Sequence, residues 1–260
     1  MNKSKFQSKL ELITSKWWFY ALFLIINFLP PYSTISVEPS QIGYVTGAVL
    51  SEGLIFSLTD LFSIFKIIPI LLILSIVYFK NKASKIFSLY ACINYVLIAV
   101  VQSIAFTNEY GFAIVTCNLI MFLLVAMFWF FELLIQKNDF TKPKLTPIKG
   151  FIIILALIAF YYPAAPTTYM PDFNPIRSLN NMAGLAFCLM TPLYIAVLAV
   201  FHPRINSVTL RVTSLTGIII AFYNLLVNFL IAPEQLWWNG ILHIPLAIVS
   251  VYGFIISFKK

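Results

Sequence analysis

Lysine and arginine occupy every second gap between the apolar stretches of this chain. They precede the first stretch, fill the second, fourth and sixth gaps, and end the chain. The other gaps carry the acids Glu38, Glu52, Asp60, Glu109, Asp172 and Glu234, with Arg177 as their one base. Basic residues gather on the cytoplasmic side of membrane proteins, so this alternation predicts a chain that crosses a bilayer repeatedly.

Composition agrees with a lipid environment. Hydrophobic residues make up 61% of the 260 residues, charged residues 10%, and the mean hydropathy is +0.93. A soluble domain of this composition would have to expose large apolar patches, whereas a bilayer accepts such a surface. We therefore expect an all-α polytopic membrane protein, with residues 1–260 forming a single transmembrane domain.

The stretches predict eight transmembrane helices with both termini in the cytoplasm. A spanning helix needs about 20 apolar residues. The expected spans are 17–30, 61–79, 86–106, 112–135, 148–162, 182–201, 208–232 and 236–258. Compact loops and the lack of organelle signals favour the plasma membrane of a prokaryotic cell.

Two halves of the chain resemble each other. Prolines follow the first and fifth spans, and Pro69 and Pro192 lie inside the second and sixth. This order suggests two parallel four-helix repeats, 1–140 and 141–260, whose seam is a default place for a ligand. Chance recurrence of prolines near helix ends is the alternative.

Each half carries one long outer loop, at 33–60 and 163–181. The first contains an apolar run around Gly43 and Gly47 that is too short to span a membrane. We expect this run to lie on the surface or to enter the membrane region while buried in protein. Loops of this length are uncommon without a purpose, so they are also candidate surfaces for a protein partner.

Two basic residues are candidate ligands for an anionic group. Lys66 lies inside the second span, where it either extends outward or meets Asp60 or Glu52. Arg177 lies in a proline-braced outer loop, and its guanidinium suits a carboxylate or phosphate. Pairing with Asp172 or with lipid headgroups is the alternative for Arg177.

Polar side chains within the last two spans are further candidates. His243 lies about two turns inside the last helix, below Asn239, and either handles protons or bonds to a neighbouring carbonyl, for instance one freed by Pro245. Asn224 and Asn228 are four residues apart and share a helical face. Such amides either join helices or line a polar path.

Cysteines and histidines restrict the chemistry. Cys92, Cys117 and Cys188 are odd in number and lack zinc-site spacing, and the two histidines cannot provide paired haem ligands. We therefore expect no cofactor and no metal. Cys117, Arg177 and His243 all face the outer half, so a thiol-dependent transferase or peptidase is one possible reading.

The net charge of +8 does not indicate nucleic-acid binding, because the basic residues are divided among five segments. The favoured function is a carrier or channel for a small polar or anionic solute, with an outward-facing cavity between two helical halves. Its expected ligand-binding residues are Lys66, Arg177, His243, Asn239, Asn224 and Asn228. A noncatalytic subunit or receptor of a larger assembly is the first alternative, and the membrane-embedded thiol enzyme is the second.

Overall fold

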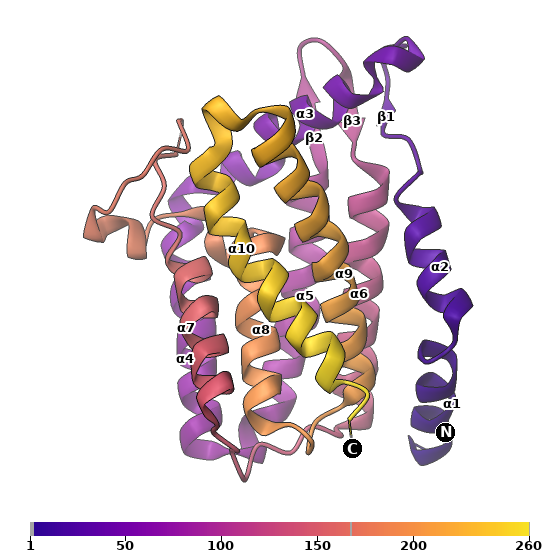
Figure 1. The fold of residues 1–260 in the computed structure, drawn as a ribbon, viewed down its shortest axis with the longest axis vertical. Coiled ribbons are helices and arrows are strands. Elements are labelled where there is room, and N and C mark those ends of the chain that lie inside the picture. The colour runs from indigo at the N-terminus through magenta and orange to yellow at the C-terminus, as the bar shows by residue number, and fades with distance from the viewer. Residues whose placement is uncertain (1–2, 167, 260) are drawn as a thin grey trace.

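The computed structural model describes residues 3–166 and 168–259, except for the side chain of Arg177. The chain forms a bundle of helices that run along one axis, with a small sheet at one end (Figure 1). The α-helices are α1 Lys3–Thr14, α2 Trp17–Ile26, α3 Ile42–Glu52, α4 Phe62–Phe79, α5 Asn81–Ser103, α6 Thr116–Ile135, α7 Pro147–Tyr161, α8 Phe187–Phe201, α9 Ser207–Leu226 and α10 Pro233–Ile256. The strands are β1 Tyr32–Ser33, β2 Ile104–Thr107 and β3 Gly111–Ile114. Short 3₁₀ helices cover Pro39–Gln41, Leu54–Leu61, Pro175–Ser178 and Met182–Leu185, and a π-helix covers Val227–Ile231.

Five helical segments of the described chain are long and apolar enough to cross a membrane. They are Leu54–Phe79, Asn81–Ser103, Thr116–Ile135, Ser207–Ile231 and Pro233–Ile256. The helices α2, α7 and α8 are apolar but shorter. A repeated membrane-crossing architecture is thus supported, while the expected number of eight crossings stays a prediction.

The helix α2 ends before its expected boundary. Its 10 residues rise about 15 Å, half the roughly 30 Å of a hydrocarbon core. Pro30 and Pro31 lack an N–H and disfavour helical backbone before them, so the helix ends at Ile26. From there the chain passes through a turn to β1 at the far end of the bundle (Figure 1).

The outward faces of the helices are apolar. Val77 is 62% exposed and Ile25 is 63% exposed, and similar side chains cover α4, α5, α6 and α7. In water this surface would be a strong aggregation liability, but hydrocarbon accepts it.

The centre of the bundle is formed by α8, of which nearly every residue is buried, and by α9, of which most residues are buried. Rings from three helices meet there, with Tyr95 and Trp129 within 5.4 Å of Tyr194 by centroid. The Asn94 amide donates to the Gly184 carbonyl and its oxygen accepts from the Tyr194 hydroxyl. These bonds join separate helices, which is one of the two roles expected for intramembrane amides.

The helix α5 ends before its expected boundary at 106 and α6 begins after its expected boundary at 112, because β2 and β3 replace helix at 104–106 and 112–114. The pairs are antiparallel and the strand order is β1-β3-β2. Gly111 adopts φ +65°, which suits a turn, and Thr107 accepts from the Tyr110 N–H within it. The all-α prediction is therefore wrong at this point.

The helix α3 packs on this sheet, and together β1, α3, β2 and β3 form what we call the outer cap. Val45 and Val49 of α3 are buried with Ala105, Ala113 and Val115. The apolar run around Gly43 and Gly47 thus forms α3 at the end of the bundle (Figure 1), with Val45 and Val49 on its buried face and Tyr44 and Leu50 exposed.

The opposite end of the bundle, which we call the inner end, carries the lysine-rich connections and both termini (Figure 1). Its loops are joined by backbone bonds, from Asp139 N to Arg204 O at 2.9 Å and from Lys144 N to Val200 O at 2.9 Å. The Asp139 carboxylate accepts from the Thr141 hydroxyl and N–H and contacts Arg204, and these groups lower its pKa. Partial burial lowers the pKa of His202, although its bond to the Lys259 carbonyl opposes the change.

The two proposed repeats differ in one helix. The helix α7 packs on α8 and α10, whereas α2, its expected counterpart, lies against α6 and α9. The pairs α5–α6 and α9–α10 do correspond as antiparallel neighbours. Duplication of the chain therefore stays a prediction.

Candidate functional site

Lys66 is fully buried and bonds to the end of α7. Its Nζ lies 2.7 Å from the Phe160 carbonyl, 2.9 Å from the Asn181 side-chain oxygen and 3.5 Å from the Tyr161 carbonyl. The last carbonyls of a helix lack intrahelical partners and carry partial negative charge, so a cationic side chain stabilises them. The sequence offered Asp60 or Glu52 as partners, but the described contacts of Lys66 are neutral oxygens and the Phe160 ring.

Asn181 completes this contact. Its amide donates to the Tyr161 carbonyl at 2.6 Å and to the Tyr162 carbonyl at 3.3 Å, while its oxygen also accepts from Ala183 N. Asn181 ends the outer loop 163–181, so Lys66 and Asn181 together hold the two ends of that loop against α7.

A second polar group lies on the other side of the α7 end. The Tyr162 hydroxyl donates to the Asn239 side-chain oxygen at 2.7 Å, and the Asn239 amide donates to the Asn228 oxygen at 3.2 Å. Tyr162 adopts φ +50° as the residue after α7, which an L-residue adopts only at a cost. Tyr162 and Asn228 are both buried, at 4% and 2% exposed.

His243 and Asn224 border the same group. The His243 Nδ1 lies 2.7 Å from the Asn239 carbonyl, so Nδ1 carries the proton and Nε2 is left as an acceptor when the ring is neutral. That carbonyl lies one helical turn before His243 and is not the one freed by Pro245. Asn224 donates to the Ile220 carbonyl and to the Cys188 sulfur. We call Tyr162, Asn224, Asn228, Asn239 and His243 the outer amide cluster.

One donor in this cluster has no partner. The Asn228 Nδ2 is buried and makes no hydrogen bond within the described part of the chain. Asn228 lies in the π-helix that ends α9, and an added Cβ at Gly240 would come within 3.0 Å of the Asn228 Cβ. Such π-helical segments occur frequently at functional sites, and an orphaned buried amide costs about 1–3 kcal/mol.

The structure thus joins three of the six residues that the sequence singled out, Asn228, Asn239 and His243, by hydrogen bonds. Asn224 precedes Asn228 on the same helical segment, and Lys66 lies across the α7 end from them. Tyr162, which links both groups, was missed. Its position after the helix, before Pro163, marks a helix end, but contact with Asn239 depends on packing that no local pattern encodes. Trp238 fixes the same junction by donating to the Pro163 carbonyl at 2.8 Å.

Arg177 lies in a 3₁₀ helix of the outer loop, and its side chain is outside the described residues. The contact of Arg177 with an anion therefore stays a prediction. Its loop begins directly after Tyr162.

The hypothesis of a thiol-dependent enzyme requires Cys117 to lie within hydrogen-bond reach of His243. The described partner of the Cys117 sulfur is the Asn118 oxygen, at 3.8 Å, and His243 bonds to Asn239. No group of three or more His, Cys, Asp and Glu side chains with metal-binding geometry occurs among the described residues.

Charged residues buried near the inner end also have neutral partners. Glu132 accepts from Asn138 N and the Asn206 amide. Arg211 donates to Thr14 and to Ser257, and lies 4.1 Å from the centre of the Phe258 ring. These contacts join α1, α6, α9 and the C-terminal residues.

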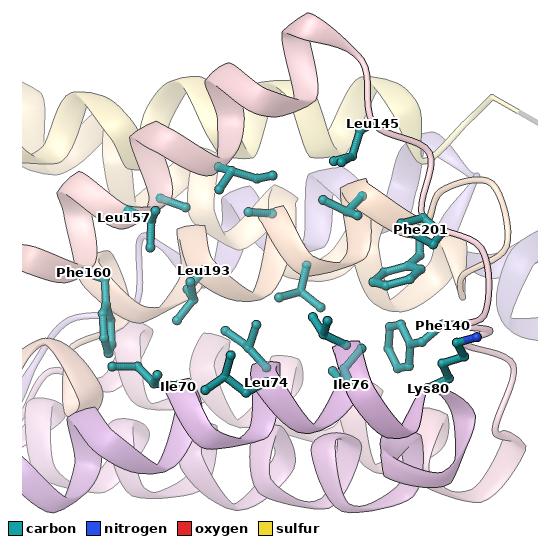
Figure 2. Close-up of a pocket in the computed structure, with 18 of the residues that line it drawn as sticks. Ile70, Leu74, Ile76, Lys80, Phe140, Leu145, Leu157, Phe160, Leu193 and Phe201 are labelled. Carbon is teal, nitrogen blue, oxygen red and sulfur yellow. The ribbon is translucent and has the colours of Figure 1, made fainter.

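A groove occurs at the seam between the proposed halves, but it differs from the expected cavity. It lies between α4, α7 and α8, and its volume is about 750 Å³ (Figure 2). All of its lining residues are apolar except Lys80 and Thr141, and these lie toward the inner end. The seam between α4, α7 and α8 thus offers an apolar groove, and the expected outward-facing cavity stays a prediction.

The fold and these clusters define a helical bundle with several helices suited to crossing a membrane. No protein-family model, curated protein sequence or solved structure matches this chain.

Proposed function

We propose that the chain is a multi-pass protein of the plasma membrane of a prokaryotic cell, with eight crossings and both termini in the cytoplasm. It acts as a carrier or channel for a small polar or anionic solute, which binds at the outer amide cluster. The observation that carries this proposal is the unpartnered, buried Nδ2 of Asn228 within a group of amides, a phenol and an imidazole.

The chemistry of the cluster suits a hydrogen-bonding solute. Asn228 offers a donor that now lacks an acceptor, and the neutral His243 ring offers an acceptor at Nε2. A solute with one acceptor and one donor satisfies both. Arg177, on the loop that follows Tyr162, is the candidate cation for an anionic solute.

Facilitated movement fits this chain better than proton or sodium coupling. Buried carboxylates are the usual carriers of coupling ions. Among the described residues the buried carboxylate is Glu132, which lies near the inner end and is held by Asn138 and Asn206. The outer amide cluster itself contains no acid.

The test begins with natively purified protein and mass spectrometry of copurifying small molecules, followed by thermal unfolding with each candidate solute. Wild-type protein is expected to gain several degrees in Tm with the correct solute. Asn228→Leu removes the 3.2 Å bond from the Asn239 amide at a cost of about 1–3 kcal/mol, and the folded variant is expected to lose the solute-dependent gain. The control is Asn118→Leu, an amide of α6 outside the cluster.

Transport is then measured as solute uptake into vesicles containing each variant. Uptake by wild type and Asn118→Leu, with none by Asn228→Leu, supports the carrier. A solute response that is equal in all three proteins argues against the cluster as its site.

The outer cap favours a second function, a noncatalytic subunit or receptor. It exposes large apolar side chains beyond the bundle, including Tyr44, which is 70% exposed, and Phe106, which is 69% exposed. Such side chains are typical of protein contacts. A stoichiometric protein that copurifies with wild type and is lost in Tyr44→Ser with Phe106→Ser would favour this function over transport.

A further inference from the structure

The groove between α4, α7 and α8 has the length of one membrane leaflet. Ile70 of α4 lies near one end, and Lys80, the residue that follows α4, lies at the other (Figure 2). Ten residues of helix rise about 15 Å, which is half of the roughly 30 Å hydrocarbon core. The groove therefore covers the half of the bundle nearest the inner end.

The walls of the groove are apolar and open to the side. Leu74, Val77 and Leu157 line it and are 47%, 62% and 53% exposed. Figure 2 shows α4 side chains facing those of α7 and α8 across this space. A hydrocarbon chain fits these walls, whereas a polar solute would find no hydrogen-bond partner along most of their length.

The inner end of the groove is basic. Lys80 lines it, and the exposed Lys142 and Lys144 flank Pro143, another lining residue. Lys144 N bonds to the carbonyl of Val200, which also lines the groove. The neighbouring acid, Asp139, is engaged by Arg204, Asn81 and Thr141. Positive charge thus lies where the apolar walls end.

We propose that this groove binds one anionic phospholipid from the leaflet at the inner end. An acyl chain lies between α4 and α7, and the phosphate contacts Lys80, Lys142 and Lys144. The apolar walls extend over about the thickness of one leaflet. A partner helix that crosses the full bilayer would therefore contact these walls over only half of its length. Charge at one end and hydrocarbon along the rest fit a lipid instead.

The test uses full-length protein in detergent and native mass spectrometry with phosphatidylglycerol or phosphatidylcholine of identical acyl chains. Wild type is expected to retain about one phosphatidylglycerol per chain, at least tenfold more tightly than phosphatidylcholine. Lys80→Gln with Lys144→Gln removes this preference. The control, Lys82→Gln with Lys85→Gln, removes the same charge from exposed positions on α5 outside the groove lining. This control should keep the preference for phosphatidylglycerol.

A second pair of variants tests the walls. Ile153 lines the groove, while its neighbour Ile154 is exposed and lies outside the lining. Ile153→Trp fills the groove and should weaken retention of both lipids at least tenfold, whereas Ile154→Trp should leave it within twofold of wild type. A folded state is checked by Tm for every variant.

Three results would overturn the proposal. Equal retention of both lipids by all variants indicates only surrounding bulk lipid. An equal loss of the preference for phosphatidylglycerol in both double lysine variants indicates general attraction between the basic protein surface and anionic lipid. A copurifying protein that is displaced by Ile153→Trp indicates a partner helix as the occupant.

Discussion

Lys66 shows how a cationic side chain can be accommodated within an apolar bundle without an acid. Its Nζ bonds to two carbonyls at the end of α7 and to Asn181. Since the α7 end carries partial negative charge, Lys66 stabilises a helix end and, with the Asn181 amide, a loop at once.

We predict that Lys66→Met destabilises the protein by about 2 kcal/mol, because the Phe160 carbonyl loses its charged donor and the Tyr161 carbonyl and the Asn181 oxygen each lose one of their donors. The measurement is thermal unfolding in detergent. Lys82→Met, at an exposed position on α5, serves as the control and should change Tm little. An equal Tm for Lys66→Met and wild type would contradict the assigned role.

At the scale of elements, the outer cap depends on one glycine. Gly111 has φ +65°, and an added Cβ would lie 2.3 Å from the Thr34 hydroxyl oxygen, beside the β1–β3 pairing. Both conformation and space therefore exclude a larger residue.

We predict that Gly111→Ala costs more than about 1 kcal/mol and loosens the cap while the bundle stays folded. Hydrogen exchange should rise in β1, β2 and β3 but not in α8. Gly150→Ala is the matched control, since Gly150 lies within α7 and an added Cβ meets nothing within 4 Å. In a helix this change is expected to be neutral or stabilising by about 0.5–1 kcal/mol. Unchanged exchange in the cap of Gly111→Ala would refute the argument.

The same elements indicate what the sequence can reveal. Long apolar runs predicted α4, α5, α6, α9 and α10, because an uninterrupted apolar stretch of this length has few other structures available. The run that ends α5 continues to Phe106, and its residues suit a helix or a strand equally. The strand is selected by pairing of β2 with β3 across the turn at Gly111, and β3 in turn pairs with the distant β1. The residues of the run alone therefore did not indicate the hairpin.

The candidate site was predictable to a similar degree. The spacing of Asn224 and Asn228 placed both on one helical face, and the depth of His243 singled it out. Contact between Asn228 and Asn239 depends on the π-helix and on the turn after α9, which no periodicity encodes. Asn181 and Tyr162 were missed for the same reason, since their partners belong to other elements.

At the scale of the whole molecule, charge distribution and loop contacts agree. The basic connections bond to one another at the inner end, through Asp139, Lys144 and Lys149, while the outer cap and the loop 163–181 lie at the other end. An ordered inner end explains how short lysine-rich loops remain fixed despite their mutual repulsion, because backbone bonds and Asp139 hold them.

This arrangement predicts which end faces the cytoplasm. We would replace Cys92, Cys117 and Cys188 by alanine and introduce either Glu109→Cys, in the outer turn, or Lys142→Cys, in the inner loop. Both positions are exposed, so differences in labelling report the side of the membrane. A membrane-impermeant maleimide on intact cells should label only Glu109→Cys, and Lys142→Cys should react after permeabilisation. Lysine-rich loops resist translocation, which is why the inner loop is expected in the cytoplasm. Labelling of Lys142→Cys in intact cells would show that the orientation is the reverse of the predicted one. It would also place the groove in the outer leaflet and the amide cluster at the cytoplasmic side.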